Sequence, residues 1–209
     1  MNYLVIEGNI GAGKTSLASK IGSKFNAKVI LEQFSDNPFL PGFYKDPARY
    51  TFPLELSFLA ERYNQIRNEL ITPDLFRTFS VSDYYFTKSL IFSKATLSGD
   101  EYNLFRQLFD IMNLSVPVPD LYVYLYNDTD KLLFNIKKRG RPYEQSITAE
   151  YLDKIQKSYF NFMKQRKDFR FLIINTKDSD FINKEVDLEV IYELIFSKRY
   201  MKGINQVEV

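Results

Sequence analysis

Short hydrophobic runs recur along the chain, and segments with helical spacing separate them. The runs lie at residues 3–7, 28–31, 76–82, 121–125 and 171–174. Runs of this kind are typical of strands buried on both faces of a parallel sheet. Because helical segments alternate with them, the pattern predicts an α/β fold with a five-stranded parallel sheet covered by helices on both faces.

Apolar residues spaced three or four positions apart predict the helices between these strands. We expect helices at 16–25, 51–70, 84–95, 100–114, 131–138, 149–166 and 187–198. The 100–114 helix is expected to face the core with Leu104, Leu108, Ile111 and Met112. Thr72 and Pro73 are expected to end the 51–70 helix, whereas residues 34–50 have no clear period and predict a binding loop.

No repeat, linker or change of composition divides the chain. We therefore expect one domain over residues 1–200, followed by a flexible tail at 201–209. No apolar stretch approaches the roughly 20 residues of a membrane span, and the N-terminus has no signal-peptide pattern. These observations predict a cytoplasmic protein with no membrane partner.

Composition narrows the possible chemistry, because the 209 residues include no cysteine and no histidine. Disulfides, thiol nucleophiles, thiolate zinc sites and Ser-His-Asp hydrolases are therefore excluded. A general base must be a carboxylate or, less commonly, a lysine or tyrosine. The formal net charge is only +2, which argues against a surface dedicated to a nucleic-acid polymer.

The first predicted strand leads directly into a phosphate-loop (Walker A) motif, G-x-x-x-x-G-K-[ST]. Its glycines allow the backbone to wind closely around a polyphosphate, and the following helix directs its positive dipole end at the same anion. The motif predicts ATP binding, with a lysine reaching the β- and γ-phosphates and a threonine hydroxyl ligating Mg²⁺. The residues concerned are Gly8, Asn9, Ile10, Gly11, Ala12, Gly13, Lys14, Thr15 and Ser16.

Two carboxylates follow predicted strands, at the sheet edge where ligands bind in open parallel sheets. Glu32 ends the second strand, and Asp83 follows the third, where phosphate-loop enzymes carry an acid that holds Mg²⁺ directly or through water. On the 51–70 helix, Glu55 and Arg62 share a face about two turns apart, roughly 10 Å. They are either surface charges or a grip on the polar edge of a flat ligand.

A basic loop around residues 139–147 is suited to closing over a transferring phosphoryl group, through Arg139 and Arg141. A solvated run of charge is the alternative interpretation of this loop. A GTPase switch needs Asp-x-x-Gly, and none of the eight glycines has an aspartate three residues before it.

Together these motifs resemble the deoxynucleoside kinases, from residue 3 to about residue 174. The resemblance implies that Glu32 takes the proton of the nucleoside 5′-hydroxyl, that Arg139 and Arg141 meet phosphate, and that Lys14 holds the donor. Further positions match the family's substrate-binding residues: Tyr44 and Glu144 for the sugar 3′-hydroxyl, Glu55 and Arg62 for the base edge, and Phe92 for stacking on the base, after a one-residue gap.

Two positions depart from the family's pattern. An arginine usually follows the third-strand acid, but Tyr84 follows Asp83 here. Either Arg139 and Arg141 neutralise charge alone, or another cation such as Lys88 takes part.

The second departure is Glu55, which stands where a glutamine is usual. A glutamine amide offers one donor and one acceptor, whereas an ionised glutamate only accepts. Two acceptors match the two adjacent donors of guanine, or the amino group of adenine alone with a proton or water completing the pair. Nearby Arg62 is expected to favour the ionised form of Glu55.

The resemblance implies a three-layer P-loop kinase fold with a short arginine-bearing lid. It implies ATP- and Mg²⁺-dependent phosphorylation of a deoxyribonucleoside 5′-hydroxyl in nucleotide salvage, by a homodimer formed through the helices after Asp83 and Asp100. Resemblance to bacterial purine-type members favours deoxyadenosine first and deoxyguanosine second. A thymidylate-type nucleoside monophosphate kinase is the alternative enzyme, although it would need an arginine where Tyr84 stands. A non-catalytic nucleotide-binding regulatory module is the alternative outside enzymes.

Overall fold

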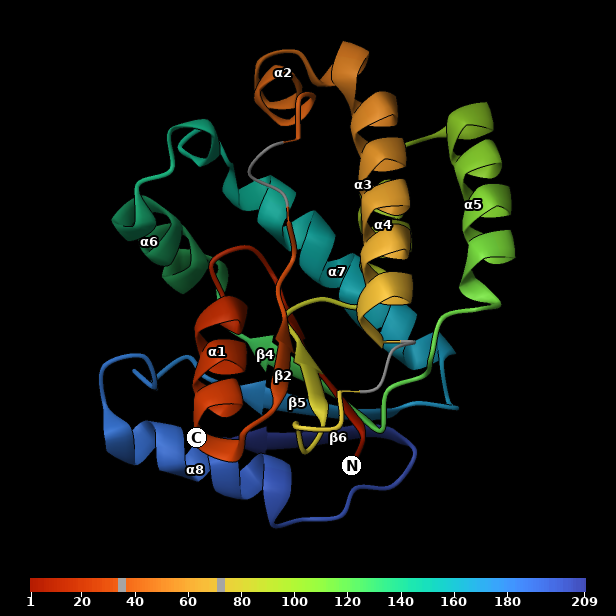
Figure 1. Cartoon of the computed structure of the whole chain (residues 1–209). Helices are drawn as coiled ribbons and strands as arrows, with labels where there is room; N and C mark the ends of the chain where they lie inside the picture. The colour runs from red at the N-terminus through yellow and green to blue at the C-terminus, as the bar shows by residue number, and fades with distance from the viewer. Residues whose placement is uncertain (34–36, 71–73) are drawn as a thin grey trace.

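The computed structural model describes residues 1–33, 37–70 and 74–209, and Figure 1 shows its arrangement. The expected helix end at Thr72 and Pro73, and the start of the expected loop at 34–36, lie outside the described residues. The elements, in chain order, are β1 (Tyr3–Gly8), α1 (Lys14–Phe25), β2 (Lys28–Ile30), α2 (Leu40–Lys45), α3 (Pro47–Leu70), β3 (Ser80–Ser82), α4 (Lys88–Thr96), α5 (Gly99–Asn113), β4 (Leu121–Tyr126), α6 (Thr129–Arg139), the 3-10 turn η1 (Pro142–Glu144), α7 (Ala149–Gln165), β5 (Arg170–Asn175), α8 (Glu185–Phe196) and β6 (Gly203–Glu208).

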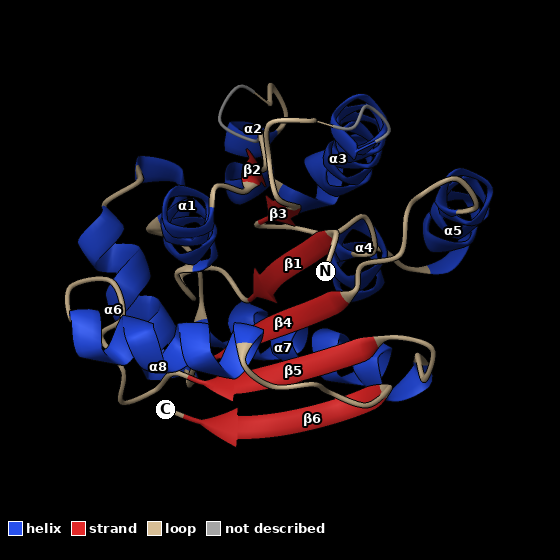
Figure 2. Cartoon of the chain, turned by 60° about the horizontal axis from the view of Figure 1, so that its bottom comes forward, coloured by secondary structure: helices blue, strands red, loops and turns tan. Residues whose placement is uncertain are grey.

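The strands form one parallel sheet in the order β2-β3-β1-β4-β5-β6. Figure 2 shows β1, β4, β5 and β6 side by side, with helices on both faces. Because β1 lies between β3 and β4, its carboxyl end opens where the strand order reverses, which is where open parallel sheets bind ligands. The phosphate loop begins at this point.

The sixth strand corrects the expected count of five and the expected flexible tail at 201–209. Residues 203–208 pair in parallel with β5, from Arg170 opposite Gly203 to Asn175 opposite Glu208. β6 lies at the edge of the sheet and alternates half-buried with exposed residues. An edge strand has one neighbour and one wet face, so its sequence lacks the continuous hydrophobic run by which buried strands are recognised.

The sheet separates two hydrophobic cores, because successive side chains of a strand point to opposite faces. On β1, Leu4 and Ile6 face a core shared with α1, α6 and α8. Tyr3 and Val5 face an aromatic-rich core shared with α3, α4, α5 and α7. The central strands are thus buried on both sides, as their continuous apolar sequences predict.

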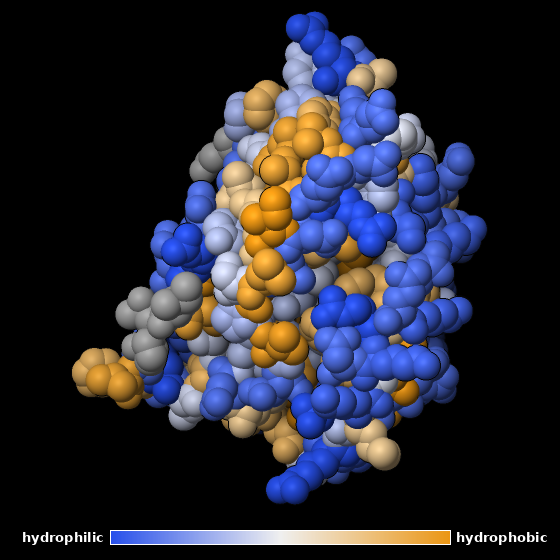
Figure 3. Space-filling model, turned by 90° about the vertical axis from the view of Figure 1, so that its right-hand side faces the viewer, coloured by the Kyte–Doolittle hydropathy of each residue, from blue (hydrophilic) through white to orange (hydrophobic). Residues whose placement is uncertain are grey.

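Of the core stripe expected on α5, Met112 is partly buried against the aromatic-rich core, but the other three residues face outward. Leu104, Leu108 and Ile111 are between 38% and 69% exposed, whereas Phe105 and Phe109 are buried. Phe109 stacks on Phe86, with ring centroids 4.9 Å apart. The helix is apolar on two faces, so spacing alone could not show which face packs inward. Figure 3, which views this side of the molecule, shows a band of hydrophobic residues on the surface.

The segment expected to be an irregular loop contains helix α2, and α3 begins at Pro47 instead of residue 51. Leu40 and Phe43 of α2 pack against Leu54 of α3, and this contact supports a helix too short to be stable alone. Within the described residues, no helix combines the length and apolar character needed to cross a bilayer.

Candidate active site

The phosphate loop joins β1 to α1 through glycines in left-handed conformations. Gly11 and Gly13 have φ angles of 84° and 87°. A Cβ atom on Gly11 would lie 2.8 Å from the carbonyl oxygen of Leu132, so only glycine fits there. Lys14 is the first residue of α1, and its ammonium donates to the carbonyl oxygen of Asn9 at 2.8 Å, across the loop.

The two ends of the loop motif have different environments. Asn9 is buried, donates to the carbonyl oxygen of Leu152 at 2.8 Å and accepts from the N–H of Ile10 at 2.9 Å. Residues 11–16 instead line an open cavity of about 1480 Å³. Gly8 and Asn9 therefore support the loop from beneath, and the later residues face the space where a triphosphate would lie.

Asp83 connects the phosphate loop to the second strand. Its Oδ2 accepts from the hydroxyl of Thr15, and its Oδ1 accepts from the backbone N–H of Glu32 at 2.7 Å. A hydroxyl and a carboxylate oxygen side by side suit Mg²⁺, which takes oxygen ligands. The described residues contain no cluster of three or more acidic ligands, so a bound ion would also need water and phosphate oxygens.

Glu32 lies between two cations. Its Oε1 accepts from Nε of Arg62 at 2.8 Å and forms an ion pair with Nη2 at 2.6 Å, and its Oε2 accepts from Nζ of Lys88 at 2.5 Å. Burial by itself would raise the pKa of the Glu32 carboxyl, but the charges of Lys88 and Arg62 lower that pKa to about 2. The Glu32 carboxylate is therefore charged across the physiological range.

Arg62 was expected to contact the edge of the base, but in this structure its guanidinium is bonded to Glu32. Besides its bonds to Glu32, its Nη1 donates to the hydroxyl of Ser89 at 2.8 Å. The guanidinium also lies over the ring of Phe58, 4.8 Å from the centroid. These contacts fix Arg62 between the Glu32 carboxylate and the start of α4, and a role in base reading stays a prediction.

The Glu55 side chain is buried, at 4% exposure, and few polar contacts replace the water that it loses. Its Oε1 accepts from the hydroxyl of Thr96 at 2.8 Å, and its Oε2 has no hydrogen-bond partner in the described part of the chain. Burial raises the pKa of Glu55 to about 7, against the lowering effects of Thr96 and Arg62. Arg62 favours the ionised form of Glu55, as expected, but burial outweighs this effect because the Arg62 guanidinium is bonded to Glu32.

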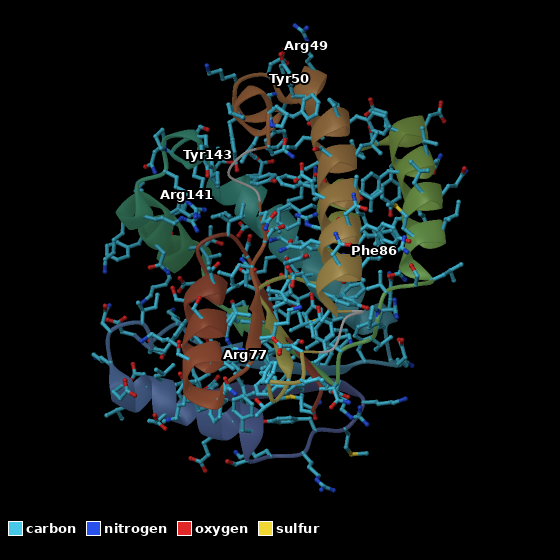
Figure 4. The ribbon with its side chains drawn as sticks, viewed as in Figure 1. Arg49, Tyr50, Arg77, Phe86, Arg141 and Tyr143 are labelled. Atoms are coloured by element: carbon cyan, nitrogen blue, oxygen red, sulfur yellow. The ribbon has the colours of Figure 1, made fainter. Side chains whose placement is uncertain are left out.

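The two arginines of the lid, Arg139 and Arg141, both form ion pairs with Glu144. Arg139 donates through Nε to Oε2 of Glu144 at 3.0 Å, and Arg141 donates through Nη1 to Oε1 at 3.2 Å. Figure 4 shows Arg141 and Tyr143 on the segment that joins α6 to α7. Tyr143 stacks on Tyr44, with centroids 6.0 Å apart, and burial together with Glu144 raises the pKa of Tyr44.

One cleft of about 840 Å³ brings the remaining expected residues together. It also adjoins the cavity at the phosphate loop, because Lys14, Thr15, Arg139 and Arg141 line both. The arrangement is a pair of adjacent cavities with three cations, Lys14, Arg139 and Arg141, at their junction. The expected residues that line the cleft are Ile10, Lys14, Thr15, Glu32, Tyr44, Glu55, Arg62, Asp83, Phe92, Arg139, Arg141 and Glu144.

Sequence reasoning missed several polar residues that support the cleft. Glu7 is buried, and it accepts from the hydroxyl of Tyr159 at 2.8 Å and from the N–H of Tyr85 at 2.9 Å. A charged residue inside an otherwise apolar strand is a signal that could have identified Glu7. Ser89 and Thr96 were missed because nothing in the sequence indicates which face of α4 meets α3.

Comparison with known proteins places these features in context. The family model described as deoxynucleoside kinase matches residues 4–199. A deoxyguanosine kinase from Bacillus subtilis (strain 168) is 33% identical over 196 residues, covering 90% of this chain and 93% of that protein. A deoxyadenosine kinase from Dictyostelium discoideum is 30% identical over 208 residues, covering 97% and 83%.

Solved structures show the same similarity in three dimensions. Deoxyadenosine kinase from M. mycoides with bound dCTP has a TM-score of 0.79 and 26% identity, over 94% of this chain and 100% of that chain. The same protein with bound dATP has a TM-score of 0.79 and 25% identity, over 92% and 98%.

Proposed function

The chain belongs to the deoxynucleoside kinase family and is a phosphotransferase, and we propose that it transfers the γ-phosphoryl group of ATP to the 5′-hydroxyl of a purine deoxyribonucleoside. Deoxyadenosine is the first candidate acceptor and deoxyguanosine the second. The observation that carries this proposal is the cleft that adjoins the phosphate-loop cavity and has Glu32 and Glu55 in its lining.

The donor site is formed by the phosphate loop. Loop N–H groups and Lys14 would hold the triphosphate, and Thr15 and Asp83 would hold Mg²⁺, which supplies charge neutralisation when bound. Burial lowers the pKa of Lys14 to about 8, with the nearby Lys88 charge adding to the effect. To reach the phosphates, the Lys14 ammonium exchanges its bond with the Asn9 carbonyl for bonds with anionic oxygens.

The acceptor site centres on Glu32. The 5′-oxygen forms a bond with the γ-phosphorus, the bond from that phosphorus to the departing ADP oxygen breaks with its electron pair, and Glu32 receives the hydroxyl proton. Arg139 and Arg141 move from Glu144 to the transferring group, where their charges stabilise its oxygens. Glu144 is then available, with Tyr44, to bind the sugar 3′-hydroxyl.

Base recognition is assigned to Glu55, with Phe92 stacking on the base. Protonated Glu55 offers one donor and one acceptor, which complements the N1 and amino group of adenine. Ionised Glu55 offers two acceptors, which complements the two adjacent donors of guanine. A pKa near 7 makes both forms accessible, and relatives named as deoxyadenosine and as deoxyguanosine kinases both occur.

A homodimer is part of this proposal. Leu104, Leu108 and Ile111 of α5 are exposed, and Figure 3 shows a hydrophobic band on this side of the molecule. Exposed apolar patches on monomers are commonly interaction surfaces. Leu108→Glu would place a charge among these exposed residues of α5, and we expect it to convert a dimer into monomers in analytical ultracentrifugation; a wild-type chain that is monomeric would remove this part of the proposal.

A substrate panel with ATP and Mg²⁺ tests the proposed reaction. We expect turnover of deoxyadenosine and deoxyguanosine, and slower turnover of deoxycytidine, thymidine and thymidylate. Turnover of thymidylate without any nucleoside would instead support the monophosphate-kinase alternative. In this structure the hydroxyl of Tyr84 donates to Gln65 at 2.8 Å, so its position supplies no cation for an acceptor phosphate.

A further inference from the structure

Lys88 occupies an energetically unfavourable place for a lysine. It is the first residue of α4 and is 6% exposed. The positive end of the helix dipole and the loss of water both disfavour a cation there. Its ammonium is 2.5 Å from Oε2 of Glu32, and its charge also acts on the buried Glu7. These two carboxylates offset the cost of burying the lysine.

The other charged groups near the reaction centre have different partners. Arg62 is held by Oε1 of Glu32 and by Ser89. Arg139 and Arg141 pair with Glu144 on the lid. Lys88 therefore contacts Oε2 of Glu32, the oxygen that Arg62 does not contact. Lys88 lies five residues after Asp83, whereas Tyr84, the residue directly after Asp83, carries no charge.

The two oxygens of Glu32 are not equivalent. Oε1 accepts a hydrogen bond from Nε of Arg62 and also lies 2.6 Å from Nη2 of the same guanidinium, whereas Oε2 accepts one hydrogen bond, from Lys88. Because a carboxylate oxygen has two lone-pair sites, Oε2 retains one for a substrate hydroxyl. A hydroxyl bonded to Oε2 at ordinary distance and angle would lie roughly 4 Å from the Lys88 ammonium.

We propose that Lys88 is a catalytic cation of this enzyme, which turns Oε2 of Glu32 toward the 5′-hydroxyl and stabilises negative charge on the attacking oxygen. The inference rests on the proposed function, in which Glu32 accepts the hydroxyl proton. As that proton moves to Oε2, the 5′-oxygen bonds to the γ-phosphorus and ADP departs with the electron pair of the broken bond. The charge of Lys88 acts where negative charge develops.

The test compares Lys88→Met, Lys88→Arg and Lys94→Met in the full-length protein. Methionine has a similar length without the charge, arginine restores the charge, and Lys94 is an exposed lysine on the same helix. We expect Lys88→Met to lower kcat about 100-fold, with a much smaller change in KM for the nucleoside. Lys88→Arg should recover at least about tenfold of this loss, and Lys94→Met should behave as the wild type.

A pH profile separates catalysis from folding. Without Lys88, Glu32 keeps Arg62 from α3 but loses one of the two cations that contact it, while Lys14 from α1 and Asp83 after β3 remain nearby. The acid limb of kcat/KM should therefore move to higher pH by about one unit in Lys88→Met and not in Lys94→Met. Thermal unfolding of each variant shows whether the fold is retained.

Wild-type kcat in Lys88→Met would overturn the inference. So would a loss that arginine does not restore and that leaves the acid limb unmoved, because a purely structural lysine would behave in that way. Glu32→Gln in the same assay tests the premise separately: full activity there contradicts the proposed role of Glu32, whereas a defect in Glu32→Gln with none in Lys88→Met overturns this inference alone.

Discussion

Two carboxylates that line one cleft differ in almost every electrostatic respect. Glu32, at the phosphate end, is bonded to Arg62 and Lys88, and its pKa is lowered to about 2. Glu55, on α3, receives one hydroxyl bond from Thr96, and its pKa is raised to about 7. Burial opposes ionisation at both positions, so the cations in direct contact decide the outcome.

The difference teaches how one cleft can hold a permanent charge and a titratable one. In the proposed reaction, phosphoryl transfer would use a carboxylate that keeps its charge across the physiological pH range. Base recognition depends on hydrogen-bond donors and acceptors, and a carboxyl group that titrates near neutrality can present either pattern. The cleft therefore has a fixed end and an adjustable end.

Removing the charge at the fixed end should have the largest effect. Glu32→Gln should lower kcat by about two to four orders of magnitude, the usual contribution of a general base. Steady-state kinetics with deoxyadenosine measures this, and Glu101→Gln on exposed α5 is the control. Near-normal kcat would remove Glu32 from the role of base and would end the functional contrast between the two carboxylates.

Replacing Glu55 by a residue that does not titrate should change how the free energy of unfolding depends on pH. Because the folded-state pKa of Glu55 is raised from 4.5 to about 7, its contribution to folding is fully present below about pH 4 and is lost as pH rises through 7. Glu55→Gln should therefore match the wild type near pH 4 and be more stable by about 2 to 3 kcal/mol near pH 8.

Urea denaturation at the two pH values measures the difference, with Glu101→Gln as the matched exposed control. A stability difference between Glu55→Gln and the wild type that is the same at both pH values would show that Glu55 does not titrate between them.

The preference between bases should follow the same titration. Raising the pH from about 6 to about 8.5 should increase the ratio of kcat/KM for deoxyguanosine to that for deoxyadenosine by about tenfold, the value of one well-matched hydrogen bond. Glu55→Gln should favour deoxyadenosine at every pH. Competition between the two nucleosides in one reaction measures the ratio, and a ratio independent of pH in the wild type would contradict base reading by Glu55.

The smallest effect is expected from Thr96→Val, which removes the hydroxyl bond to Glu55 and keeps a similar shape. Because that bond favours the ionised form, its loss should raise the pKa of Glu55 further. The midpoint of the pH-dependent base ratio should move upward by less than about one unit. A downward shift would mean that the Thr96 hydroxyl stabilises the protonated form instead.

The sequence was most informative where chemistry requires a fixed local pattern. The phosphate loop needs its glycines and Lys14 at set spacing, and Glu32 and Asp83 follow strands, so the position of each could be predicted. The pKa of Glu55 could not be predicted, because it depends on how completely three helices exclude water from its side chain. Arg62 was expected to compensate Glu55, and only the packing of α3 on α4 directs it to Glu32 and Ser89.

The errors in the fold predicted from the sequence have the same origin. Leu104 and Phe105 are both apolar residues of α5, and their order in the sequence does not say which of them meets Phe86. β6 was missed because half of an edge strand faces water. In each case the deciding partner is distant in the sequence, which a local pattern does not record.

The central position of β1 also bears on how the protein is made. Of the strands that the structure describes, β1 leaves the ribosome before the others, yet its neighbours are β3 and β4, which follow later in the chain. Until β4 is synthesised, the apolar residues of β1 lack a complete sheet, and the phosphate loop lacks the Leu132 carbonyl that packs against Gly11. We therefore expect nascent chains shorter than this to depend on chaperones and to gain no stability from ATP.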